Sequence, residues 1–123
     1  MPAGLELTLV AESPLLYNPT AMDVDARGRL WVTEAIDYRR WNGRNPGFDI
    51  PGGDRVVILE DTDGDGVYDE SKVFVQEDAL VSPLGIAVIG DEVWVSCSPD
   101  LIVYTDRDHD DKPDRPGGRR VAL

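Results

Sequence analysis

The sequence predicts an all-β protein built from two copies of a four-stranded antiparallel unit. Short segments of β-branched and aromatic residues recur along the 123-residue chain, Gly- and Pro-containing turns separate them, and the same landmarks appear twice. Each copy runs from a proline, through a Trp-containing strand, to an Asp-rich loop. Repeats of about 40–50 residues with four strands each are typical of β-propeller blades, so we expect about two such blades. A sandwich of eight strands is the alternative.

The first copy is expected at residues 19–80, after a lead-in at residues 1–18. Residues 5–11 of the lead-in alternate apolar and polar side chains, which predicts a strand with one buried face. A long insertion at residues 35–54, rich in Gly, Pro and Asn, separates the second strand of this copy from the third. The four strands are predicted at residues 21–25, 30–34, 55–60 and 71–75.

The second copy is expected at residues 81–123 and repeats the same order without the insertion. Pro83 corresponds to Pro19, and Trp94 corresponds to Trp31. Its strands are predicted at residues 86–88, 93–97, 101–105 and 120–123. The repeated landmarks favour a true duplication over an unrelated set of eight strands.

An Asp-rich loop between the third and fourth strands of each copy is a candidate metal site. Carboxylates at alternate positions of a tight loop can converge on one point, and ligand sets made only of oxygen favour calcium. The first loop is not an EF-hand, because Lys72 occupies its position 12 and its flanking segments are strand-like. A solvated acidic turn without metal is the alternative. The predicted ligands are the side chains of Asp61, Asp63, Asp65 and Asp69 and the backbone carbonyl of Val67.

The second loop repeats the Asp spacing of the first, at relative positions 1, 3, 5 and 9. Asp111 stands where the first loop has Gly66, so we expect Asp111 to adopt a positive φ. His109 is expected to be an exposed spacer between ligands. A degenerate, metal-free turn is the alternative for this loop. The predicted ligands are Asp106, Asp108, Asp110 and Asp114, with Lys112 at the position equivalent to Val67.

The charge balance excludes a nucleic-acid-binding role and agrees with metal binding. The chain has 24 acidic and 12 basic residues, a formal charge of −12, and no basic face is evident. Cys97 is the single cysteine, so it is expected to be a buried, inert thiol. No apolar run is long enough to predict a transmembrane segment. Weak Asp-rich calcium sites suit millimolar extracellular calcium, so we expect a periplasmic or secreted location.

The ordered series of segments at residues 28–35, 37–39, 53–66 and 83–88 resembles the propeller of a bacterial family of membrane-bound dehydrogenase-like proteins. Those propellers are related to the quinoprotein glucose/sorbosone dehydrogenases, and many are joined to a haem-binding cytochrome c-like domain. The resemblance implies a six-bladed ring, of which this chain holds about two blades, with residues 5–11 as its closing strand. It implies that pyrroloquinoline quinone (PQQ) binds only to a complete propeller, since the later blades with their histidine-containing segment are not in this sequence.

Two functional hypotheses follow for the chain. The first is a calcium-stabilised scaffold segment, with one or two Ca²⁺, of a quinoprotein sugar/alcohol dehydrogenase-like protein that is not catalytic on its own. The alternative is a non-enzymatic binding module that assembles with itself, three copies closing a six-bladed ring. The insertion connects strands at the opposite end from the acidic loops. Polar and aromatic residues on this insertion face, in the insertion or at the end of the strand before it, either contact a sugar or anionic cofactor or only cap the propeller mouth. These candidates are Glu34, Tyr38, Arg39 and Trp41.

Overall fold

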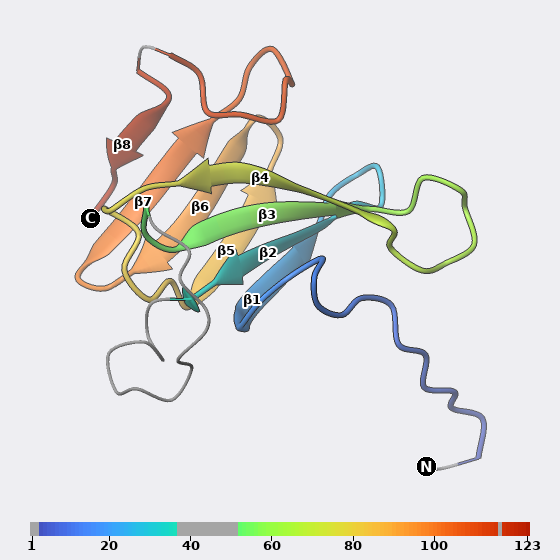
Figure 1. Cartoon of the computed structure of the whole chain (residues 1–123). Coiled ribbons are helices and arrows are strands. Elements are labelled where there is room, and N and C mark those ends of the chain that lie inside the picture. The colour runs from blue at the N-terminus through green and yellow to red at the C-terminus, as the bar shows by residue number, and fades with distance from the viewer. Residues whose placement is uncertain (1–2, 37–51, 116) are drawn as a thin grey trace.

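Two four-stranded antiparallel sheets make up the computed structural model, which describes residues 3–36, 52–115 and 117–123 (Figure 1). This arrangement confirms the all-β prediction and the duplicated four-stranded unit. In each sheet the strands lie in the order in which they occur in the sequence. The first sheet contains β1 (Pro19–Val24), β2 (Leu30–Glu34), β3 (Arg55–Glu60) and β4 (Glu70–Gln76). The second contains β5 (Gly85–Ile89), β6 (Glu92–Cys97), β7 (Asp100–Thr105) and β8 (Arg119–Val121).

The central strands form where β-branched and aromatic residues are densest. All five residues of β2 are buried, as are the four middle residues of β3, so both faces of the first sheet are covered at its centre. The predicted bounds of β2 and β3 agree with the structure, and the bounds of the other strands differ by one or two residues. Strand existence therefore follows from local composition, whereas the exact ends depend on the neighbouring turns.

The predicted strand at residues 5–11 is wrong. This segment forms no strand, and the side chain of Leu7 is 85% exposed. Among the described residues, no strand lies alongside it to complete a hydrogen-bonded ladder. The carbonyl of Val10 does accept a hydrogen bond from the Tyr68 backbone N–H at 2.9 Å. Apolar alternation alone does not stabilise an extended segment whose backbone groups lack a partner strand.

The two sheets pack face to face around an apolar core (Figure 1). Phe74 lies edge-on to Trp31, with ring centroids 4.9 Å apart, and also contacts Tyr104 of the second sheet. Cys97 is buried in this core, and its Sγ accepts a hydrogen bond from the Val81 backbone N–H at 3.1 Å. The core residues are Trp31, Val56, Ile58, Phe74 and Leu80 from the first copy and Val93, Val95, Cys97, Ile102 and Tyr104 from the second.

Strand register makes the two sheets equivalent, residue by residue. The row Trp31–Ile58–Lys72 of the first sheet corresponds to the row Trp94–Val103–Arg120 of the second. Side chains alternate between the two faces of a strand, so each sheet has a Trp face and an opposite apolar face. The apolar face of the second sheet packs on the Trp face of the first. The apolar face of the first sheet, formed by Leu30, Val32, Val57 and Leu59, is covered by Ala11, Leu15, Leu16 and Tyr68.

An ion cluster joins the two sheets at the end where the acidic loops lie. Arg29 Nη1 lies 2.8 Å from both carboxylate oxygens of Asp111, and Lys72 Nζ lies 2.7 Å from one of them. Arg29 also donates through Nε to Asp25 at 2.8 Å. Burial opposes ionisation of Asp111, but the hydrogen bonds from Lys72 and Arg29 outweigh it and hold its pKa below the ordinary value.

Asp111 adopts the predicted positive φ of 64°, and its ion pairs explain why glycine is not there. The left-handed conformation costs a non-glycine residue about 1–2 kcal/mol. The side chains of Arg29 and Asp111 are only 10% and 12% exposed, so their charge-assisted hydrogen bonds are partly shielded from water. Such bonds contribute about 1.5–3 kcal/mol each. The sequence predicts a metal-binding loop, with a degenerate turn as the alternative, but it does not reveal these ion pairs, because Arg29 and Lys72 lie 82 and 39 positions before Asp111.

Asp111→Gly should therefore destabilise the protein by about 1–3 kcal/mol, even though glycine suits the backbone better. His109→Gly is the matched control, because His109 has a φ of 56° but its largely exposed Nε2 contacts only Asp91, at 3.0 Å. Thermal unfolding of both variants in the presence of a chelator separates the effects. A rise in the melting temperature of Asp111→Gly would show that backbone strain outweighs the contacts between sheets.

Candidate metal centres

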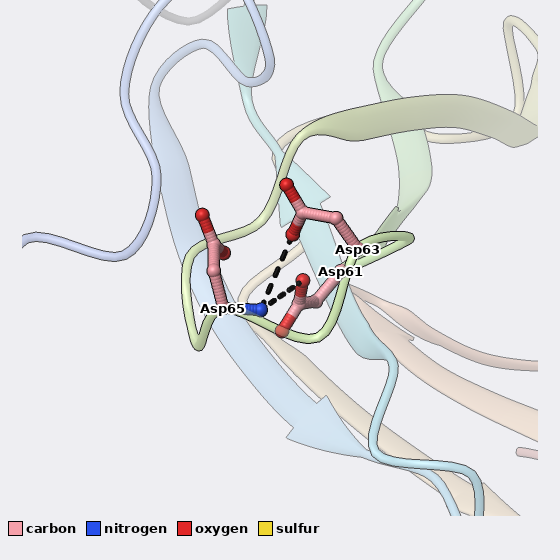
Figure 2. A group of neighbouring side chains, drawn as sticks. All are labelled: Asp61, Asp63 and Asp65. Carbon is pink, nitrogen blue, oxygen red and sulfur yellow. Dashed lines mark hydrogen bonds between the residues drawn. The ribbon is translucent and has the colours of Figure 1, made fainter.

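The first acidic loop connects β3 to β4 and brings three carboxylates together (Figure 2). Asp61, Asp63 and Asp65 each place a carboxylate oxygen within 4.8 Å of the others. Gly66 adopts a φ of 87°, a conformation that lets the chain turn back towards Asp61. Three of the four predicted side-chain ligands of this loop are therefore close enough to share one cation.

Backbone N–H groups hold these carboxylates in place. Asp61 accepts hydrogen bonds from the N–H groups of Gly64 at 2.9 Å and Gly66 at 2.8 Å. The N–H of Asp65 lies 3.3 Å from Asp61 Oδ1 and 3.2 Å from Asp63 Oδ1 (Figure 2). These bonds fix the side chains without consuming all of their oxygen lone pairs, since a carboxylate offers about four acceptor sites.

The second acidic loop, between β7 and β8, repeats most of this hydrogen-bond pattern. Asp106 accepts from the N–H groups of Asp110 and Asp111, each at 3.1 Å, as Asp61 does from Asp65 and Gly66. The remaining matches pair a carboxylate with the same relative N–H in both loops. Asp63 and its equivalent Asp108 each accept from the N–H two residues later, and so do Asp65 and its equivalent Asp110. Asp69 accepts from the Thr62 N–H, and the equivalent Asp114 accepts from the Arg107 N–H.

The carboxylates that converge differ between the loops. In the second loop the group is Asp106, Asp108 and Asp114, again within 4.8 Å of one another. Asp69 lies outside the first group, and Asp110 lies outside the second. The Asp69 carboxylate is bonded to the Thr62 hydroxyl at 2.7 Å. The backbone carbonyls of Val67 and Lys112 remain predicted ligands.

Crowding changes the pKa values of the loop carboxylates in opposite directions. The N–H of Gly66 holds the pKa of Asp61 below its ordinary value. The pKa of Asp63 is raised, because the favourable N–H of Asp65 is outweighed by the neighbouring carboxylates of Asp61 and Asp65. Burial, and then the nearby carboxylate of Asp108, raise the pKa of Asp106. A raised pKa on one carboxylate beside a lowered pKa on its neighbour indicates repulsion between the two negative charges, which a shared cation would relieve.

The first loop holds the less compensated negative charge. Residues 61–69 contain four aspartates and no lysine or arginine. In the second loop, Arg107 Nη1 lies 3.5 Å from Asp114, and Asp111 is paired with Arg29 and Lys72. Calcium affinity rises with the net charge of the ligands, so the first loop should bind a divalent cation more tightly.

Residues 1–117 match a protein family described as a domain of unknown function, DUF7133. The chain belongs to the DUF7133 family. No curated protein and no solved structure matches it. Both acidic loops lie within the matched residues, so they are part of the DUF7133 domain. In the described part of this domain, no helix is long and apolar enough to cross a membrane.

The predicted candidates on the insertion face are only partly placed by the structure. Glu34 is fully buried, and its two oxygens accept hydrogen bonds from the Tyr17 N–H at 2.9 Å and from Arg55 Nε at 2.6 Å. This contact ties the DUF7133 lead-in to β2 and β3, which gives Glu34 a structural role. Tyr38, Arg39 and Trp41 lie outside the described residues. The ends of the insertion meet β2 and β3 at Glu34 and Arg55, opposite the end that carries the first acidic loop.

The bond from Thr62 to Asp69 can be tested directly. The hydrogen bond from the Thr62 hydroxyl is the main cause of the lowered pKa of Asp69. Desolvation raises this pKa, and hydrogen bonds from backbone N–H groups lower it further. Thr62→Val should therefore raise the pKa of Asp69 towards its ordinary value, and Thr62→Ser should leave it low. A titration of the side-chain carboxyl carbon by NMR, with chelator present, measures both. An unchanged pKa in Thr62→Val would show that the hydroxyl does not hold this carboxylate.

Proposed function

We propose that this DUF7133 domain is a calcium-stabilised structural scaffold formed by two β-propeller blades, with no catalytic role of its own. The observation that carries the proposal is the repetition of one hydrogen-bond pattern in two acidic loops 45 residues apart in sequence. A chance acidic turn has no reason to repeat a nine-residue pattern of carboxylates and N–H partners. A shared ligand is a reason for such repetition.

Calcium fits the chemistry of the loops better than other common metals. The converging groups are all carboxylates, which favour hard cations, and no histidine or cysteine takes part in either group. Calcium accepts irregular arrangements of six to eight oxygens, whereas magnesium demands a near-octahedral site. Calcium in turn supports a periplasmic or secreted location, where the ion is abundant.

The packing of the sheets supports propeller blades over a conventional sandwich. Each sheet is a meander of four consecutive strands, whereas sandwiches commonly use connections that cross between sheets. The first strand of each sheet, β1 or β5, packs against the other sheet, as expected for inner strands near a common axis. The link to a quinoprotein sugar/alcohol dehydrogenase-like parent, and to PQQ, comes from the sequence resemblance and concerns a complete propeller.

Calcium should raise the melting temperature of the purified chain above its value in chelator. A ligand that binds only the folded state stabilises by about 2.7 kcal/mol at 100 times its dissociation constant. Asp63→Asn and Asp108→Asn should each remove part of this calcium-dependent rise in melting temperature, and the double variant should remove all of it. Asp63→Asn should remove the larger part, because the first loop is expected to bind calcium more tightly. Asp78→Asn is the matched control, since Asp78 is an exposed aspartate outside both loops.

Two results would contradict the proposal in different ways. Equal melting temperatures in calcium and in chelator would show that the loops are solvated turns. Turnover of an aldose with added PQQ and a dye acceptor would overturn the scaffold role while leaving calcium binding intact.

A further inference from the structure

An apolar groove of about 380 Å³ lies between the N-terminal segment and β1. Its lining is almost wholly apolar and includes Val10, Ala11, Leu16, Ala21, Met22 and Val32. Met22 is 70% exposed, and Val24, further along β1, is 55% exposed. Adjacent exposed apolar side chains on one strand mark a surface that a partner covers.

The second sheet shows what covers these positions. By register, Met22 and Val24 of β1 correspond to Ile86 and Val88 of β5. Ile86 and Val88 are partly buried and pack against the core that includes Trp31. The same two positions are thus covered by a Trp face in the second sheet and exposed in the first. The missing partner of Met22 and Val24 is a Trp face of the same type.

The chain itself carries such a face. The Trp face of the second sheet presents Trp94, with Ala87 beside it and Arg120 stacked 5.5 Å from the Trp94 ring. Ile89, two residues after Ala87 and therefore on the same face, is 62% exposed. The shielded Trp94 Nε1 has no hydrogen-bond partner among the described residues. In the first sheet the equivalent Trp31 Nε1 donates to Asp25 at 2.9 Å.

Charge is complementary across the same stacking. Within the chain, Lys72 on the Trp face of the first sheet reaches Asp111 in the acidic loop of the second. Arg120 occupies the position of Lys72 in the second sheet. If copies stack in the same way, Arg120, which lies 2.8 Å from Glu92 of its own chain, faces the first acidic loop of the next copy. Gly66 stands there at the position of Asp111, so the attraction comes from the overall negative charge of residues 61–69, which include no basic side chain, and not from an equivalent ion pair.

We propose that the occupant of this groove is a second copy of the chain, docked head to tail through Ile89 and Trp94. The N-terminal segment covers the centre of the apolar face but leaves Met22 and Val24 on β1 open, and β1 is the strand on which the other sheet packs within the chain. A head-to-tail contact leaves one groove and one Trp face free, so assembly continues until a ring closes. The inference rests on the proposed sheet-stacking scaffold but not on calcium, so assembly persists in chelator.

Light scattering after size-exclusion chromatography tests the docking. The wild type should give a multiple of 13.6 kDa, and Met22→Glu and Ile89→Glu should each give 13.6 kDa. A mixture of these two variants should form a dimer, because one retains its Trp face and the other its groove. Val81→Glu, at a 63% exposed position outside both surfaces, should assemble like the wild type.

A wild type of 13.6 kDa at all concentrations would overturn the proposal, as would a mixture of the two Glu variants that stays monomeric. A second measurement avoids the introduced charges. Val24→Cys mixed with Ile89→Cys should form an intermolecular disulfide, whereas either variant mixed with wild type should not. Cys97 does not interfere, because it is buried in the core. Failure of calcium to raise the melting temperature would leave these outcomes unaffected.

Discussion

Electrostatic crowding in the two acidic hairpins is the constraint on which the rest of this structure depends. Each hairpin holds a group of three carboxylates with oxygens within 4.8 Å of one another, in a chain of formal charge −12. Backbone N–H groups offset part of the repulsion and orient the side chains, but they supply no full positive charge. The sheets keep each loop closed, because their strands fix the loop ends, and a divalent cation would supply the charge that remains missing.

The hairpins also determine how the sheets meet. Asp111 takes part in the second loop through its N–H, which is bonded to Asp106, and in the sheet interface through its carboxylate, which is bonded to Arg29 and Lys72. One residue therefore connects a candidate ligand group to the packing of Trp31 and its neighbours. In the first loop Gly66 occupies this position, so no equivalent ion pair extends from that loop. The two loops share most of their backbone hydrogen-bond pattern but differ in the carboxylates that converge and in their structural connections.

Much of the fold could be predicted because its signals are local. Trp31 and Trp94, the flanking β-branched residues and the Asp spacing identify the strands and the loops that join them. The strand at residues 5–11 could not be predicted correctly, because a strand needs a partner that local alternation does not reveal. The roles of Asp111 and Glu34 depend on contacts with residues distant in sequence, which the spacing of residues along the chain does not contain. Asp69 is held by the Thr62 hydroxyl of the same loop, a local contact that the Asp spacing does not reveal.

Comparison of the two repeats also indicates which exposed surfaces should be covered by a partner. Because register equates the residues of the two sheets, a face that is buried in one sheet shows what its exposed counterpart in the other should contact. Met22 and Val24 are informative for this reason, whereas scattered exposed residues such as Leu5 and Leu7 are not. The same comparison relates Arg120 to Lys72 and is the basis for the proposed docking at the Trp94 face.

The number of calcium ions bound to each folded chain tests this account most directly. Native mass spectrometry of the chain, after exchange into calcium at neutral pH, counts the ions without reference to stability or assembly. The account predicts two ions per chain and one ion in each single variant, because Asp63→Asn disables the first loop and Asp108→Asn disables the second. A folded chain that binds no calcium would contradict it.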